Sequence, residues 1–193
     1  MSDEPTGQVI EDEDDLDAER EARRRIALAQ IRQYPDPALR LAANPVEDVD
    51  DDLHRLIERM KTLMVEARGV GLAATQVGVI RRLFVFQLPE EDEARAVVNP
   101  ELIERSDEVV SDDEGCLSLQ HVLVPVERHV SVTLVGRDEA GDDLRLELEG
   151  HGARVVQHEL DHLDGVLIID RTTDEARREA LATLRPQPVL GLR

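Results

Sequence analysis

The sequence predicts an α+β fold in which antiparallel strands pack around a central helix that carries the pattern H-E-x-x-H. Two observations lead to this prediction. Short runs of β-branched and alternating apolar residues gather between positions 82 and 148, where strands are expected. Two segments with apolar residues at helical spacing, 49–67 and 151–163, lie on either side of these runs. A chain of 193 residues is long enough for one domain with a substantial core.

The chain opens with a strongly acidic segment. Residues 1–19 contain nine acids and no Lys or Arg, about half of the formal net charge of −20. Such a composition cannot bury enough apolar surface to fold alone, so we expect a disordered tail over residues 1–25. The domain itself is expected at 26–185, and a flexible end at 186–193, where Pro186 and Pro188 stand. We interpret the tail as an aid to solubility, and contact with a basic partner is the alternative.

The predicted elements follow in order along the chain. A charged helical start at 20–32 and a proline-marked segment at 34–45 lead to an amphipathic helix at 49–67. Gly69 is placed to end that helix in a left-handed conformation. A hairpin turn is expected at 137–142 and a last short helix at 174–184. Strands are expected at 82–86, 96–98, 108–110, 122–126, 130–135 and 144–148.

The segment 157–162 reads QHELDH and lies in the predicted helix 151–163. Residues four apart on a helix share one face, so His158 and His162 can present two imidazoles to one metal ion. Glu159 points to the side, where it can exchange a proton with a water on the metal without binding the metal itself. The alternative is a surface helix with two incidental histidines.

A catalytic metal site usually has three protein ligands. Ile168 occupies the position that holds a third histidine in elongated metalloprotease patterns, and it cannot bind a metal. Glu175 and Glu179 stand among arginines, a pattern typical of a solvated helix face. Cys116 follows Gly115 in EGCLS, and a thiolate with two imidazoles suits a divalent metal of borderline softness. The alternative for this single cysteine is a small buried hydrophobe.

A third segment, GVGLAATQ at 69–76, keeps its backbone nearly bare, so that another molecule could lie close against it. Gln76 ends the segment with an amide that can donate to a developing oxyanion. The spacing differs from that of a phosphate-binding loop, and the lysine of such loops is absent. A tight turn between helix and strand is the alternative interpretation.

Taken together, the segments GVGLAATQ, EGCLS and QHELDH resemble the peptide deformylase family, which carries G-x-G-x-A-A-x-Q, E-G-C-x-S and Q-H-E-x-D-H in this order. The resemblance covers about residues 31–172. It includes YPDPALR at 34–40, GVLIIDR at 165–171, and NPEL at 99–102, which is similar to the family's mid-chain turn. It implies the family's α+β fold and its reaction, hydrolysis of the formyl group from the N-terminal formylmethionine of new polypeptides with release of formate.

The resemblance also implies a role for each matched position. Glu159 would be the general acid and base. Gln76 and the backbone amide of Leu117 would hold the carbonyl oxygen as it gains charge, and Gly71 would line the substrate cleft. One divalent metal ion would be bound, Fe²⁺ in the cell, with Zn²⁺, Ni²⁺ or Co²⁺ as substitutes. Its ligands would be Cys116, His158 and His162.

The chain departs from the family pattern after EGCLS. The family usually continues with a hydrophobic residue, Pro and Gly, whereas Leu119, Gln120 and His121 stand here. This segment flanks the cleft in relatives, so the departure bears on substrate preference. We interpret His121 as a solvated loop histidine, with approach to the site as the alternative. His151 stands where an aliphatic residue is common. Candidates for orienting the ligands are Arg154, Arg128 and Glu114.

Composition narrows the classes of function. Strong acidity argues against nonspecific nucleic-acid binding. No apolar run reaches membrane-spanning length and no secretory signal opens the chain, so a cytoplasmic enzyme is expected. Docking of the helix at 174–184 to the ribosome stays open, because some relatives use such a helix near the tunnel exit. The alternatives are a metal-dependent amidase or peptidase of other specificity and a noncatalytic ribosome-associated protein.

Overall fold

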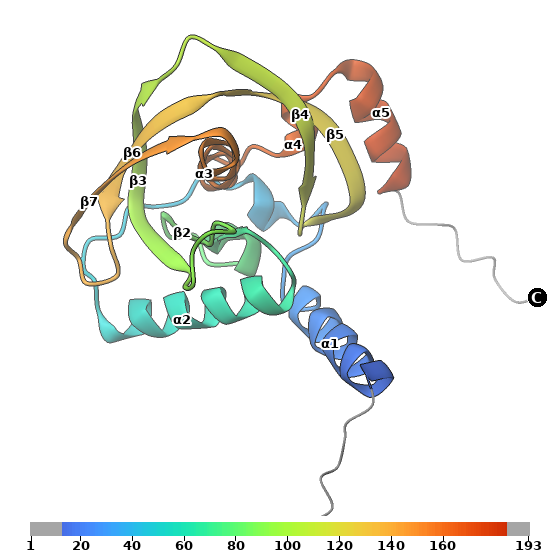
Figure 1. Ribbon diagram of the computed structural model, residues 1–193, viewed down its shortest axis with the longest axis horizontal. Helices are drawn as coiled ribbons and strands as arrows, with labels where there is room; N and C mark the ends of the chain where they lie inside the picture. The colour runs from blue at the N-terminus through green and yellow to red at the C-terminus, as the bar shows by residue number, and fades with distance from the viewer. Residues whose placement is uncertain (1–12, 185–193) are drawn as a thin grey trace, which may run out of the picture.

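The computed structural model describes residues 13–184, and the expectations for 1–12 and 185–193 lie outside the described residues. Two antiparallel sheets surround one helix, as Figure 1 shows. The larger sheet has the strand order β1-β2-β3-β6-β7, and the smaller sheet pairs β4 with β5. The strands are β1 (Gly71–Ala73), β2 (Leu83–Phe86), β3 (Arg95–Arg105), β4 (Val109–Cys116), β5 (Leu119–His129), β6 (Ser131–Arg137) and β7 (Asp143–Glu149).

Five α-helices and two short 3₁₀ helices complete the described part of the chain. The 3₁₀ helices are η1 (Pro37–Arg40) and η2 (Ala74–Val77). The α-helices are α1 (Glu13–Leu28), α2 (Asp51–Glu66), α3 (Gly150–Leu163), α4 (Ile168–Arg171) and α5 (Asp174–Thr183). The expected antiparallel α+β architecture is confirmed. No helix between residues 13 and 184 is long and apolar enough to cross a membrane.

Helix α3 lies between the sheets and is seen end-on in the middle of Figure 1. Its apolar side chains, among them Val156 and Leu163, pack with Phe84 and Phe86 of β2 in one buried cluster. Gln157 ties the helix to β5, because its side chain accepts from the backbone N–H of His129 and donates to the carbonyl of the same residue. Burial on nearly every side holds the helix in one orientation relative to both sheets.

Helix α2 forms a second apolar cluster with β1 and β2, and it begins and ends at identifiable residues. Asp50 caps its first turn by accepting from the backbone N–H of Leu53 at 2.8 Å. The expectation that Gly69 ends the helix in a left-handed conformation is wrong. Arg68 takes that conformation, with φ of 58°, and the N–H of Gly69 donates to the carbonyl of Met64.

The structure differs from the predicted elements in three further places. Residues 13–25, expected in a disordered tail, lie in α1, where neighbouring arginines and acids pair across single turns. The glycine segment forms β1 and η2 rather than a loop, because its small residues fit the buried edge of the sheet. The expected turn at 99–102 is an irregularity within β3, since Asn99 has φ of 51° and Pro100 has no N–H for the ladder.

Candidate active site

A cavity of about 910 Å³ opens between the two sheets. Its walls come from segments far apart in the sequence: the start of β1, the hairpin of β4 and β5, and the inward face of α3. Arg24 and Leu28 of α1 contribute one end of the wall. Residues from all three sequence motifs therefore meet in one cleft.

Cys116 and His158 line this cleft, and the buried His162 lies next to them. Their potential ligand atoms all lie within 4.8 Å of one another, and they form a possible metal site. The Sγ atom of Cys116 lies 3.2 Å from Nε2 of His162. The two histidines are one helical turn apart in α3, with ring centroids separated by 4.9 Å.

The cysteine reaches this position because β4 ends in a tight hairpin. Cys116 is paired with Leu119 across the turn, after an irregularity in the ladder that follows Glu114. The backbone N–H of Ser118 points at the sulfur, with a nitrogen-to-sulfur distance of 3.4 Å. This contact holds the sulfur in a fixed position at the end of the hairpin.

Gln76 lies on the other side of the sulfur. Its Oε1 accepts from the backbone N–H of Ala73 at 2.8 Å, and this contact fixes which end of the amide faces the cleft. The Nε2 group then lies 3.1 Å from Oγ of Ser118 and 3.7 Å from Sγ of Cys116. Thr75, the residue before it, donates to the carbonyl of His162 at 3.1 Å. The short helix η2 is thereby anchored to α3 at the site.

Glu159 is buried, with 4 % of its surface exposed, and its carboxylate lies against Gly71. A Cβ atom at position 71 would overlap that carboxylate, which explains why glycine stands there. Among residues 13–184, no group hydrogen-bonds Oε2 of Glu159. A buried carboxylate oxygen without a protein partner, beside the cluster, is placed to receive a proton from water or substrate.

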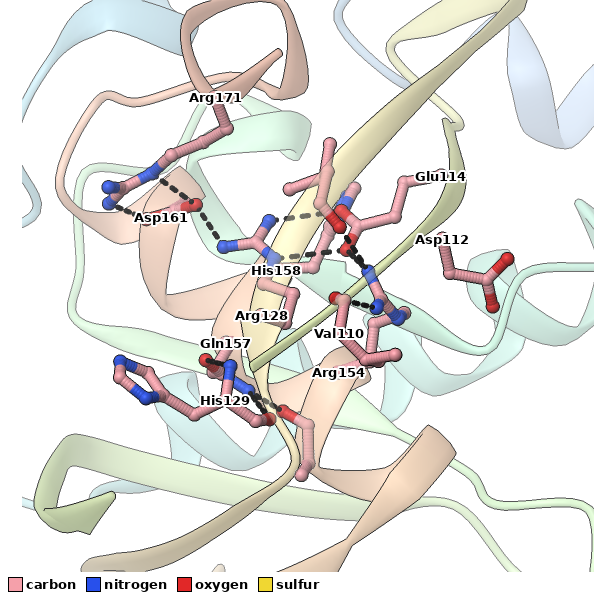
Figure 2. A network of polar contacts seen from close by, with 12 residues as sticks. Val110, Asp112, Glu114, Arg128, His129, Arg154, Gln157, His158, Asp161 and Arg171 are labelled. Carbon is pink, nitrogen blue, oxygen red and sulfur yellow. Dashed lines mark hydrogen bonds and ion pairs between the residues drawn. The ribbon is translucent and has the colours of Figure 1, made fainter. Parts of the chain in front are cut away.

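Behind the cluster, a chain of buried charges orients His158 (Figure 2). Nδ1 of His158 lies 3.0 Å from Oε2 of Glu114, so Nε2 is left to face the cleft. Arg128 binds both oxygens of Glu114, at 2.9 and 3.0 Å, and reaches Asp161 at 2.5 Å. Arg154 donates to Glu114 at 2.7 Å. The remaining member of the chain is Arg171, which holds Asp161 from the outside.

The carboxyl groups of Glu114 and Glu159 differ widely in pKa, because their surroundings differ. Burial alone would raise the pKa of Glu114, but hydrogen bonds and charge from His158 and Arg128 outweigh it and lower the pKa to about 2. Burial raises the pKa of Glu159 to about 7 and outweighs the opposing charges of His158 and Arg128, while the charge of Glu114 acts in the same direction as burial. Glu114 is therefore a permanent anion, whereas Glu159 can gain or lose a proton near neutral pH.

The two histidines also differ. Burial, followed by the charge of His158, holds the pKa of His162 well below its ordinary value, so its ring is neutral. Burial acts in the same direction on His158, but its contacts with Cys116 and Glu114 more than offset this and raise its pKa. Metal binding at His158 must then displace a proton.

The donor set fits a divalent ion of borderline softness. One sulfur and two imidazole nitrogens converge, Nε2 of His162 faces the sulfur of Cys116, and the cleft leaves one side of the cluster open. Three protein ligands with an open side are typical of catalytic rather than structural sites.

The structure also locates the other residues weighed in the sequence. Glu175 and Glu179 are exposed on α5 and stand apart from the cluster. His121 and His151 line the cleft without joining the three ligands, and His121 lies in β5 rather than in a loop. Sequence reasoning missed the pair formed by Asp161 and Arg171. An acid inside the apolar pattern of 155–163 was the available signal, because a buried charge requires a partner.

An α+β fold with an open Cys-His-His cluster and a buried glutamate beside it belongs to the class of metal-dependent hydrolases. The sequence pattern of the polypeptide deformylase family matches residues 28–178. A peptide deformylase of Thermotoga sp. (strain RQ2) is 45% identical over 148 residues, which cover 77% of this chain and 89% of the relative. The chain belongs to the polypeptide deformylase family.

Solved structures agree with this assignment. A peptide deformylase from Legionella pneumophila superposes with a TM-score of 0.77 at 38% identity, covering 80% of this chain and 91% of that one. A peptide deformylase from Synechococcus elongatus in complex with actinonin gives 0.76 at 37% identity, covering 79% and 85%. The chain is thus a metal-dependent hydrolase that removes the formyl group from the N-terminal formylmethionine of newly made polypeptides and releases formate.

Proposed function

We propose that Cys116, His158 and His162 hold one divalent ion, and that α3 is the central, metal-carrying helix of the fold. The observation that carries the proposal is the convergence of the three ligand atoms within 4.8 Å. Fe²⁺ is proposed for the cell, and the same donors accommodate Zn²⁺, Ni²⁺ or Co²⁺. Such an ion supplies Lewis acidity, which makes hydroxide available near neutral pH and polarises a carbonyl group.

Glu159 is proposed as the general base and acid. Its carboxylate is buried beside the cluster, has an oxygen without a partner among residues 13–184, and has a pKa raised by burial to about 7. It accepts a proton from the attacking water and returns it to the amine, which must leave in its protonated form. A pKa near the working pH serves both transfers.

Gln76 and the backbone amide of Leu117 are proposed to bind the formyl oxygen as it becomes an oxyanion. Support comes from Gln76, whose Nε2 faces the cleft beside Cys116 because Ala73 holds the other end of its amide. Donors fixed before the reaction need no reorganisation when the charge develops. Gly71 is proposed to line the substrate cleft with its backbone, since the absence of a side chain leaves space for Glu159 and the substrate together.

The substrates are nascent polypeptides that begin with formylmethionine, and a cytoplasmic location follows from where such chains are made. The proposal includes docking of α5 at the ribosome, supported by the exposed arginines Arg177 and Arg178, and no direct nucleic-acid binding, supported by the net charge of −20. Cosedimentation with ribosomes tests the docking, and loss of binding on replacing both arginines is the expected result.

The decisive experiment is formate release from a formyl-methionyl peptide by protein purified without oxygen and supplied with Fe²⁺. We expect rapid release that stops with a chelator and returns with added metal. An acetyl-methionyl peptide is the matched control, and we expect it to remain intact. Release from the acetyl peptide alone would instead favour an amidase of other specificity.

A further inference from the structure

The cleft of this chain extends beyond the reacting groups to two arginines. Arg24 of α1 and Arg68 after α2 line the same cavity as Glu159 and the ligand cluster. Helix α1 lies almost wholly before the matched family range, which begins at residue 28. Figure 1 shows α1 at the C-terminal end of α2. Arg24 lines the cleft from α1, and Arg68 lines it from the turn that follows α2.

For a peptide that runs from Glu159 along the wall past Gly69, Arg68 lies beyond the first residue. Glu159 lies against Gly71, which marks the reacting end, and a Cβ on Gly69 would lie 2.7 Å from the side chain of Leu117. Arg68 comes next. Arg68 precedes the strand at Gly71 and lines the same wall, so its side chain is available to peptide residues that follow the methionine.

The backbone at Arg68 gives an independent reason to assign it a role. Its φ of 58° lies in the left-handed region, where a side chain is unfavourable and glycine is the usual residue after a helix. Glycine follows at the next position, so a small residue is tolerated in this segment. Strained residues of this kind persist where the side chain serves a function.

Both guanidinium groups keep free donors. Nε of Arg24 is buried without a partner within the described part of the chain. The carboxylate of Glu21 lies nearest to both groups within the described residues, at 3.6 Å from Arg24 and 3.9 Å from Arg68. Both distances are longer than a hydrogen bond. Arg154, which also lines the cleft, is occupied by Glu114 and by two backbone carbonyls.

We propose that Arg24 and Arg68 form an anion-binding rim that favours formylated chains with acidic residues after the methionine. The proposal rests on the proposed deformylase site, because it assumes that the peptide runs from Glu159 toward the rim. Glu21 is a weak internal competitor for the same donors. Asp112 and Asp113 line the cleft as well, and they would favour basic residues instead, so the two arrangements make opposite predictions.

The test compares three peptides of equal length with amidated C-termini: formyl-Met-Ala-Gln-Gln, formyl-Met-Ala-Glu-Glu and formyl-Met-Ala-Lys-Lys. We expect kcat/KM for the glutamate peptide to exceed that for the glutamine peptide by about two- to fivefold at low salt, within the range of an exposed ion pair. The difference should lie in KM, and it should shrink at high salt. Equal values for these two peptides, or a preference for lysine, would overturn the rim.

Variants locate the effect. The double variant Arg24→Gln and Arg68→Gln should lose the preference for the glutamate peptide over the glutamine peptide. Glu21→Gln should increase this preference, because it removes the internal competitor. Arg20→Gln and Arg23→Gln are charge-matched controls on the same helix, 69% and 68% exposed and outside the cavity wall, and they should keep it. A preference that survives the double variant, or that the controls lose equally, would overturn the assignment.

Arg68→Gly separates specificity from stability. Glycine relieves the left-handed strain, so we expect Tm to rise by about 2 °C while the preference for the glutamate peptide falls. A fall in Tm would show that Arg68 is retained for the fold, against the proposal. The glutamine peptide distinguishes failure of the proposed catalytic site from failure of the rim. Slow turnover of this peptide would count against the catalytic site. Fast turnover of all three peptides without a charge preference would count only against the rim.

Discussion

Replacing Arg128 with Met should destabilise the protein far more than the loss of an exposed arginine. Arg128 is 5% exposed and holds two buried carboxylates, Glu114 through two hydrogen bonds and Asp161 through one. Methionine fills a similar volume but cannot pair with either acid. The change therefore removes two hydrogen bonds to Glu114 and leaves its buried carboxylate with only Arg154 and His158 as partners.

The pKa of Glu114 gives the magnitude. A shift from 4.5 to about 2 corresponds to about 3 kcal/mol in favour of the carboxylate, and His158 and Arg128 share it. Asp161 keeps Arg171 as a partner, so its loss is smaller. Broken buried pairs usually cost about 3–5 kcal/mol. We therefore expect Arg128→Met to lower the free energy of unfolding by about 3 kcal/mol at neutral pH.

Urea unfolding of the metal-loaded protein measures this difference. The matched control is Arg145→Met, because Arg145 is half exposed and its carboxylate partners lie at 3.4 and 3.6 Å, so less than about 1 kcal/mol is expected. Adding Glu114→Gln to Arg128→Met should recover part of the loss, because it removes a buried charge that has lost its main partner. If Arg128→Met costs no more than Arg145→Met, the buried network does not contribute as argued.

Three further predictions concern the catalytic groups. Glu159→Ala should retain metal but lose turnover by about a hundredfold or more, and a near-normal rate with full metal content would refute the acid-base role. Cys116→Ala should bind metal more weakly, as measured by dialysis against a chelator, whereas unchanged metal content would mean that the third ligand is another residue. Because the pKa of Glu159 is raised in the folded state, its protonated form favours folding at low pH. This contribution to the free energy of unfolding is lost as the pH rises from 4.5 through about 7. In metal-free protein, Glu159→Gln should therefore gain about 2 kcal/mol relative to the parent chain between pH 5 and pH 8, and a gap that stays constant in urea unfolding would contradict the assigned pKa.

Much of the site could be predicted because most of its residues lie in three short sequence motifs. His158 and His162 are one helical turn apart, so their common face follows from helix geometry alone. The convergence of Cys116 with them, from 46 positions away, came from the resemblance to a known family rather than from local patterns. The α+β architecture was accessible from the alternation of apolar residues in the strands.

The parts that sequence reasoning missed depend on contacts between distant residues or on backbone conformations that residue propensity does not predict. Asp161 and Arg171 pair around the end of α3, and only the fold brings Arg128 from β5 between Asp161 and Glu114. The left-handed residue after α2 is Arg68, although propensity favours the glycine that follows. Helix α1 has a composition typical of disorder, yet its last turns pack Ala27 into the core with α2.

The ligand cluster joins two parts of the molecule that share no sheet. Cys116 ends the two-stranded sheet, whereas His158 and His162 belong to the helix packed on the five-stranded sheet. An ion held by all three would act as a cross-link over 46 positions, and a disulfide closing a loop of that length restricts the unfolded chain by about 4 kcal/mol. Such a cross-link would restrain the hairpin of β4 and β5 relative to α3. Amide hydrogen exchange in β4 and β5 should slow when metal is added, and equal rates with and without metal would show that the hairpin is held by its packing alone.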